Sequence, residues 1–159
     1  MTMRSIAAVV LLFASPALAH PAFVDVQIGP KLRAEAAKSL GVRDVDQLAA
    51  ELSRQVTQEL DRTGVLQGAR LELILVDAKP NRPTFKQLSN RPGLSMRSFG
   101  LGGAAIEGRA IAVDGTISPI HYQWYETDIT QAPYTTTWSD ANTAFDRFAR
   151  RLARGDTQR

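Results

Sequence analysis

The residues that could take part in chemistry are few, because the chain has two histidines and no cysteine. Thiolate metal sites, disulfides and cysteine nucleophiles are therefore excluded within it. His20 follows Ala17-Leu18-Ala19, so cleavage after Ala19 would leave a free amine and an imidazole on one residue. Imidazole nitrogens bind copper well, and His121 could supply a third nitrogen ligand. The alternative assigns His121 to packing or hydrogen bonding within a strand.

A basic segment rich in glycine and proline, from Asp77 to Gly103, is the second candidate site. The triplet Asn-Arg-Pro occurs in it twice, at residues 81–83 and 90–92, and each proline favours an extended conformation of the residue before it. We expect a long irregular segment, and loops of this length are commonly functional. A recognition loop would present a basic and aromatic set to an anionic partner: Arg82, Phe85, Lys86, Arg91, Arg97 and Phe99. The alternative is a mobile surface connection in which Phe85 and Leu88 pack locally.

Motifs for nucleotide binding and catalysis are weak. Residues 100–105 fit the pattern G-x-G-x-x-A, but a dinucleotide site needs a strand before this motif and a helix after it. We expect a strand to follow instead, with the glycines marking a bulge or a tight entry into the sheet. No G-x-S-x-G elbow occurs, so the sequence favours a binding protein over an enzyme and predicts neither catalytic residues nor a cofactor. An enzyme would need a pocket that gathers His121, Tyr122 or Tyr125 with acidic residues.

Residues 1–19 have the features of a secretory signal peptide. A basic start at Arg4 precedes an apolar run from Ile6 to Phe13 and the small residues Ala17 and Ala19. We expect cleavage after Ala19, a periplasmic location and a single mature domain over residues 20–159. The apolar run is too short to span a bilayer and no lipobox cysteine is present, so we expect neither a membrane-spanning segment nor a lipid anchor. A net charge of +3 gives no support for nucleic acid binding.

Hydrophobic periodicity predicts the elements that would position these residues. Residues 23–28 alternate like a half-buried strand, and residues 44–62 repeat apolar positions at the spacing of an amphipathic helix. Residues 71–76 are almost continuously apolar, which predicts a well-covered strand. Asp114-Gly115 favours a tight hairpin turn between strands at residues 105–113 and 117–129.

The last part of the chain predicts a short strand and a helix. Pro133 could begin an edge strand over Tyr134 to Trp138. Ser139 or Asp140 could cap a helix whose apolar stripe consists of Ala141, Phe145, Phe148, Ala149 and Leu152. The order of elements predicts an α+β fold, a two-layer sandwich in which two main helices cover one face of a mostly antiparallel sheet of four to five strands.

Five short motifs carry a resemblance to known proteins: NRPTFKQL (81–88), RPGLS (91–95), SFGLGGA (98–104), TWSDA (137–141) and AFDRFA (144–149). Over roughly residues 70–153 the chain resembles an uncharacterised family of small exported proteins of Gram-negative bacteria. More remotely, the order of elements is similar to that of envelope lipoproteins of unknown function and of the amino-terminal α/β domain of TolB. These resemblances imply an accessory role in the cell envelope and carry over no catalytic residues.

We therefore predict a periplasmic, non-enzymatic accessory or interaction domain that binds an envelope protein or an anionic envelope component. An exposed edge of the sheet and the basic segment are the two candidate surfaces. The alternative is a small periplasmic ligand- or copper-binding protein that uses His20 and His121, a set similar to the histidine brace of copper oxygenases and of some periplasmic copper carriers. The sequence makes no prediction of the oligomeric state.

Overall fold

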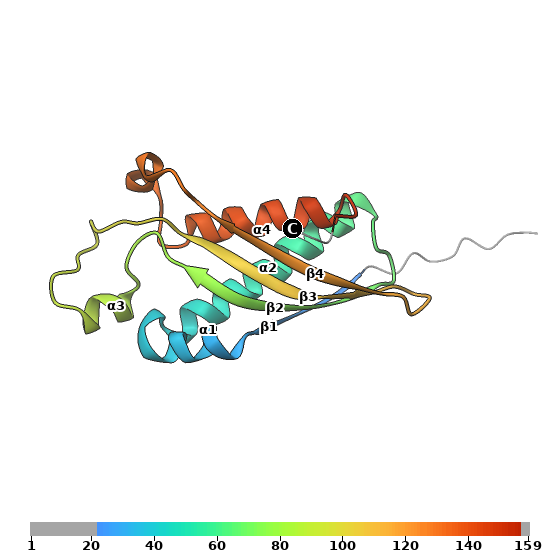
Figure 1. Ribbon diagram of the computed structural model, residues 1–159, viewed down its shortest axis with the longest axis horizontal. Helices are drawn as coiled ribbons and strands as arrows, with labels where there is room; N and C mark the ends of the chain where they lie inside the picture. Colours follow the sequence, from blue (N-terminus) through green and yellow to red (C-terminus); the bar gives the residue numbers. More distant parts are fainter. Residues whose placement is uncertain (1–21, 157–159) are drawn as a thin grey trace, which may run out of the picture.

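The computed structural model describes residues 22–156, so the expected leader and His20 lie outside the described part of the chain. A four-stranded sheet forms one layer and helices cover one of its faces (Figure 1). The strands are β1 (Phe23–Ile28), β2 (Arg70–Lys79), β3 (Gly103–Ile111) and β4 (Ile117–Tyr125), arranged in the order β1-β2-β3-β4. β1 is parallel to β2, whereas the other two pairs are antiparallel. The predicted α+β two-layer sandwich is confirmed.

The crossover that the parallel pair requires consists of three helical segments. These are α1 (Pro30–Glu35), the π-helical turn η1 (Ala36–Leu40) and α2 (Val42–Thr63). Gly64 ends α2 in the left-handed conformation, with a φ of 68°, and its N–H donates to the carbonyl of Leu60. The predicted apolar stripe of α2 is buried against the sheet: Val45, Leu48, Ala49, Leu52, Val56 and Leu60.

The second main helix, α4 (Ser139–Leu152), packs beside α2 and covers β3 and β4, while α2 packs mainly on β1. Its stripe is buried as predicted, and the ring of Phe148 lies 5.4 Å from that of Tyr122. Ile120, Tyr122 and Trp124 of β4 face this helix layer, as their alternation predicts. None of the helices within residues 22–156 is long and apolar enough to cross a bilayer.

The predicted cap of α4 is wrong. Trp138 is the N-cap residue, and its side chain makes no capping hydrogen bond. Ser139 is instead the first helical residue, and its Oγ accepts the N–H of Thr136 at 2.8 Å. Asp140 points into the protein, where its carboxylate accepts the N–H of Gly102 in the segment before β3. The carboxylate therefore does not cap the helix.

The predicted edge strand at residues 134–138 is also wrong, and the described residues contain no fifth strand. Tyr134 is instead the last residue of a 3₁₀ helix, η2 (Ile129–Tyr134), and residues 135–138 form a loop and a turn. The side chain of Asp128 accepts the N–H of Thr130 and so caps η2. The carbonyls of Pro133 and Thr135 are occupied by the guanidinium of Arg82, which leaves this stretch unable to pair with β4 through them.

The hairpin at Asp114-Gly115 is confirmed. Gly115 has a φ of 84°, and the carboxylate of Asp114 accepts the N–H of Thr116 at 2.9 Å. β4 ends at Tyr125 rather than at Ile129. A strand, β3, follows the glycines at 100–103, so the structural context of a dinucleotide fingerprint is absent there, as expected.

A bulge at Val76 shifts by one residue the alternation of β2 side chains between the two faces of the sheet. Leu75 pairs with Ile106 and Asp77 with Ala105, so β2 has one extra residue at this point. Leu71, Leu73 and Leu75 face the helices before the bulge, and Ala78 does so after it. As a result Asp77 lies on the face of the sheet without helices.

Candidate functional site

The segment between β2 and β3 is ordered around one buried side chain, Asn81, which is 1% exposed. Its amide donates to the carboxylate of Asp140 at 2.5 Å and its carbonyl oxygen accepts the N–H of Asp140 at 2.9 Å. The same carboxylate accepts the N–H of Gly102 at 2.9 Å. Backbone hydrogen bonds from Asn81 to Thr137 and from Gly100 to Asn81 close the arrangement. The start and the end of the segment are therefore both fixed to the first turn of α4.

Arg82 holds this segment together rather than presenting its charge. Its guanidinium donates to three carbonyls, those of Thr135 at 2.6 Å, Pro133 at 2.6 Å and Met96 at 3.0 Å. These acceptors belong to η2, the residue that follows it and the loop before β3. Arg82 was predicted to contact an anionic partner, and this is corrected, because all three of its donor nitrogens are used within the protein.

A short helix, α3 (Phe85–Asn90), lies inside the segment that was predicted to be irregular. Thr84 and Gln87 form a capping box: the hydroxyl of Thr84 accepts the N–H of Gln87, and the side chain of Gln87 accepts the N–H of Thr84. The amide of Asn90 donates to the carbonyl of Lys38 and so fastens α3 to η1. The local packing expected of Phe85 is wrong, because this side chain is 77% exposed.

The other predicted basic and aromatic residues do lie on the surface. Arg91, Arg97 and Phe99 are exposed and Lys86 is half-buried, and no described residue forms an ion pair with these cations. α3, the loop before β3 and η2 all lie at the same end of the molecule, opposite the β3–β4 turn (Figure 1). We call the exposed set at this end the loop end: Phe85, Lys86, Arg91, Met96, Arg97, Phe99, Leu101, Ile129 and Tyr134.

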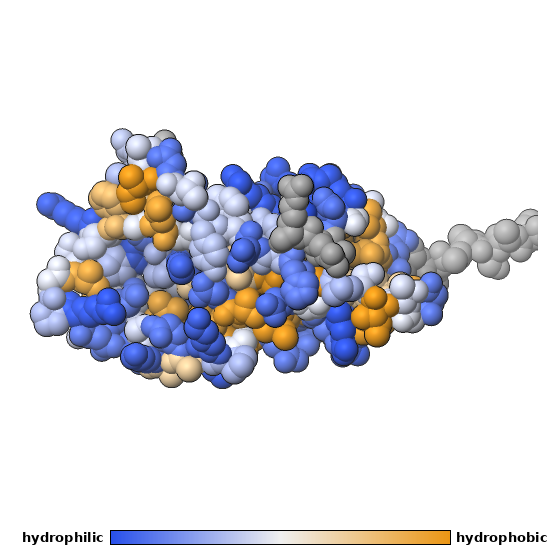
Figure 2. All heavy atoms as spheres, viewed as in Figure 1, coloured by the Kyte–Doolittle hydropathy of each residue, from blue (hydrophilic) through white to orange (hydrophobic). Residues whose placement is uncertain are grey.

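Sequence patterns missed four apolar members of the loop end: Met96, Leu101, Ile129 and Tyr134. Ile129 and Tyr134 were assigned to strands, where one face would have been covered. Figure 2 shows hydrophobic surface at this end, over η2 and the neighbouring loop. Most of the exposed large apolar side chains among the described residues are here, so this surface is unusually apolar for an exposed one.

Acidic residues at the loop end are confined to the exit of β4. The carboxylate of Glu126 accepts the N–H groups of Asp128 and Thr127, and these hydrogen bonds lower its pKa. The pKa of Asp128 is lowered by hydrogen bonds from the hydroxyl and the N–H of Thr130. Between Ala78 and Ile106, by contrast, there are five basic residues and no acidic one. Within this stretch Lys86, Arg91 and Arg97 form no ion pair with a described residue.

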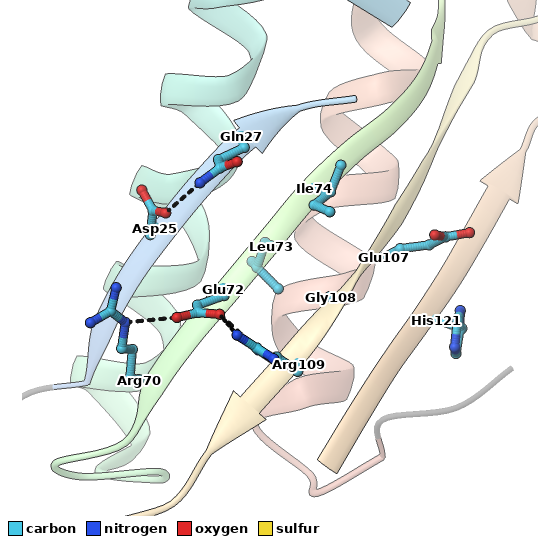
Figure 3. A pocket seen from close by; sticks show the side chains of 10 residues that line it. All are labelled: Asp25, Gln27, Arg70, Glu72, Leu73, Ile74, Glu107, Gly108, Arg109 and His121. Carbon is cyan, nitrogen blue, oxygen red and sulfur yellow. Dashed lines mark hydrogen bonds and ion pairs between the residues drawn. The ribbon is translucent and has the colours of Figure 1, made fainter. Parts of the chain in front are cut away.

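His121 lies on the open face of the sheet, the face without helices (Figure 3). This face has a shallow depression of about 480 Å³ lined by both acidic and basic residues. At its centre Glu72 pairs with Arg109 at 2.7 Å and with Arg70 at 3.0 Å. His121 itself is exposed, so the packed position considered for it is wrong. Both arginines of the depression therefore pair with Glu72, whereas Asp25 and Glu107 form no ion pair with a described residue.

A shared copper site of His20 and His121 gains no support. His20 lies outside the described residues, so its pairing with His121 stays a prediction. Among residues 22–156, no group of three possible metal ligands occurs.

His121 lines depressions of the sheet together with the acidic Glu107, and one of these depressions also touches Tyr122. Tyr122 lies in the core on the helix side, whereas His121 is on the open face. Tyr125 is also on the open face, but its hydroxyl donates to Asp77 at 2.5 Å. Burial, followed by this hydrogen bond and the negative charge of Asp77, raises the pKa of Tyr125. A neutral, hydrogen-bonded phenol is a structural group rather than a poised acid or base.

The comparisons with protein families and with curated proteins add no functional information to this geometry. No protein-family model matches the chain, and no curated protein matches it either.

Proposed function

We propose that this protein is a non-enzymatic docking domain of the bacterial cell envelope, exported to the periplasm, whose loop end binds an anionic lipid surface. The observation that carries the proposal is the combination at one end of unpaired cations with exposed aromatic and aliphatic side chains. Cations can contact phosphate groups while apolar side chains enter the boundary between headgroups and acyl chains. The expected signal peptide and the resemblance to envelope proteins support the location.

The rigid support of the loop end favours binding without a large ordering cost. Asn81 and Arg82 fix the segment to α4 and η2, so its exposed side chains are held in place before any partner arrives. Each Lys or Arg near an anionic bilayer contributes about 1 kcal/mol, and full burial of an apolar side chain about 1.5–3 kcal/mol. Three cations and two phenylalanines would together contribute several kcal/mol, enough for reversible binding.

The test is co-sedimentation of the mature protein with phosphatidylethanolamine vesicles that contain or lack phosphatidylglycerol. We expect binding only to the anionic vesicles, and weaker binding as salt is added because the attraction of exposed charges is screened. Lipopolysaccharide micelles form a separate arm, which shows whether the phosphates of lipid A serve instead of those of a phospholipid. Equal binding to both vesicle types, or binding to none of these surfaces, contradicts the proposal.

Two pairs of variants separate the loop end from general charge and hydrophobicity. Replacing Phe85 and Phe99 with Ser should weaken vesicle binding about tenfold or more, because each loses contact with the acyl boundary. The matched control replaces Val113 and Ile117 with Ser, since these side chains are 78% and 58% exposed at the opposite end. Likewise, Ala at Arg91 and Arg97 should weaken binding about tenfold or more.

The control for the charge change is Ala at Arg150 and Arg154, which removes the same number of charges from α4 and the residues that follow it. If this pair weakens binding as much as the pair at the loop end, net charge rather than the loop end determines binding. No observation on the described residues favours the copper alternative as a second function.

A further inference from the structure

The outer edge of β1 presents a row of backbone groups that no strand uses. Phe23 donates its N–H to Ala69 and Gly29 donates to Leu75, so the odd-numbered residues of β1 face β2. The N–H and C=O groups of Val24, Val26 and Ile28 therefore point away from the sheet. Such a row is a template for one further strand.

A groove runs between this edge and α2. Its volume is about 540 Å³. The wall opposite β1 consists of the small residues Ala49, Ala50 and Ser53 of α2, together with Asp46 of α2 and Arg33 of α1. Val24, Val26 and Ile28 face the helix layer but are only half-buried, because no strand within residues 22–156 lies beside them on the outer side. The groove can therefore receive the alternate side chains of an added strand beneath α2.

The opposite edge of the sheet is protected against the same pairing. Ala112 donates to Thr116, and Glu126 donates to Gly102, so the even-numbered residues of β4 bond to β3 and the odd-numbered ones face outward. Pro119 is one of the outward positions and has no N–H to offer. β1 contains no proline and no bulge. The β4 edge therefore lacks a backbone donor at Pro119, whereas every outward residue of β1 has one.

A second copy of this chain does not fit the β1 edge. If two β1 strands paired about a two-fold axis they would lie about 5 Å apart, and α2 packs mainly on β1 itself. The two α2 helices would then approach to roughly the same distance, whereas packed helices need about 8–10 Å. The occupant must therefore be a strand that brings no covering helix of its own.

We propose that the β1 edge binds an extended segment of a partner protein by strand addition, in a way that is independent of the loop end. The segment has aliphatic residues at alternate positions, which enter the groove under α2. It has a Lys or Arg on the other side, because Asp25 lies on the open face with only Gln27 as a hydrogen-bond partner and forms no ion pair with a described residue. Backbone hydrogen bonds supply affinity and the alternate side chains supply selectivity.

The experiment selects binders to the mature protein from a displayed library of random peptides. We expect enriched peptides that alternate aliphatic and polar residues with one basic position. With a synthetic enriched peptide, amide hydrogen exchange should slow at Val24, Val26 and Ile28 and change little at the odd-numbered residues, which are already hydrogen bonded to β2. Failure to enrich such peptides, or protection elsewhere, overturns the proposal.

Val26→Pro removes an outward N–H while leaving the bonds between β1 and β2, and edge strands tolerate proline at such positions. It should weaken peptide binding about tenfold or more. Ala50→Arg should do the same by filling the groove, whereas Gln47→Arg, an exposed position on α2 outside the groove, should not. Circular dichroism and thermal melting establish that each variant is folded. Peptides that bind Val26→Pro and Ala50→Arg as tightly as the wild type refute strand addition, and vesicle binding of the same variants tests the loop end separately.

Discussion

At the scale of single residues, the repeated triplet Asn-Arg-Pro shows what a sequence can and cannot reveal. The repeat is visible in the sequence, but the residues of its two copies make different contacts. Asn81 is buried and bonds to Asp140, whereas Asn90 is exposed and bonds only to the carbonyl of Lys38. The guanidinium of Arg82 donates to three backbone carbonyls, whereas Arg91 is exposed. Only the distant partners, in η2 and α4, distinguish the copies, and no local pattern names those partners.

The two asparagines give a matched prediction for stability. Asn81→Ala should lower the free energy of unfolding by about 3 kcal/mol, because it leaves the buried carboxylate of Asp140 without its amide donor. Asn90→Ala should change it by less than about 1 kcal/mol, since the lost bond is exposed to water. Urea unfolding of both variants measures the difference. Equal effects would mean that the contact between Asn81 and Asp140 is not the anchor of the segment.

Tyr125 gives a prediction about pH. Its pKa is raised in the folded protein, so folding keeps the phenol neutral where the unfolded chain ionises it. The stability that Tyr125 contributes is therefore fully present below its unfolded pKa of about 10 and is lost as the pH rises above that value. We expect the wild type to lose more stability than Tyr125→Phe between about pH 10 and 12. Denaturant unfolding at both pH values provides the comparison, and identical losses would contradict the raised pKa.

At the scale of elements, periodicity predicted α2, α4, the strands and the hairpin, because each buries one regular face. It missed α3, although Thr84 and Gln87 have the spacing of a capping box and could have revealed it. It also placed a strand at 134–138 on composition alone. There the carbonyl contacts of Arg82 outweigh the local preference of Thr and Tyr for strands.

The glycines before β3 were expected to mark a tight entry into the sheet, and their surroundings support a graded prediction. A Cβ on Gly102 would lie 2.7 Å from the carbonyl of Lys79 and from the side chain of Asn81, whereas one on Gly100 meets nothing within 4 Å. Gly102→Ala should therefore cost about 2 kcal/mol or more of unfolding free energy, and Gly100→Ala should be nearly neutral. Thermal melting of the pair measures this, and a neutral Gly102→Ala would show that the entry has room to relax.

At the scale of the whole molecule, the fold class follows from the order of elements, but the position of the binding surface does not. The loop end is assembled from two stretches that are separate in sequence, residues 85–101 and η2, and Arg82 connects them. Its apolar members lie in η2 and the loop before β3, where sequence patterns give little indication of exposure. The basic residues of the candidate site and its two phenylalanines could therefore be predicted from the sequence, whereas its other apolar members could not.

Because one side chain connects the parts of the loop end, Arg82→Lys should loosen that end while leaving the sheet intact. An ammonium cannot reach three carbonyls in the directions that a guanidinium does. We expect faster tryptic cleavage after Arg97 and weaker vesicle binding, with amide exchange in β2 and β3 unchanged. Arg91→Lys is the control, because the guanidinium of Arg91 forms no ion pair with any residue that the structure describes. Unchanged cleavage in Arg82→Lys would show that other contacts hold the loop end.

The mixed sheet also has a consequence for how the chain folds. β3 and β4 are joined by a tight turn, whereas the partners in β1 and β2, such as Phe23 and Arg70, are far apart in the sequence. Loop closure disfavours such distant contacts until local ones have formed, so β1 should join the sheet last and leave it first. Its departure would uncover the edge of β2, whose buried face carries Leu71, Leu73 and Leu75. An exposed, leucine-rich edge is prone to aggregate, so the folding chain is open to self-association until β1 has paired with β2.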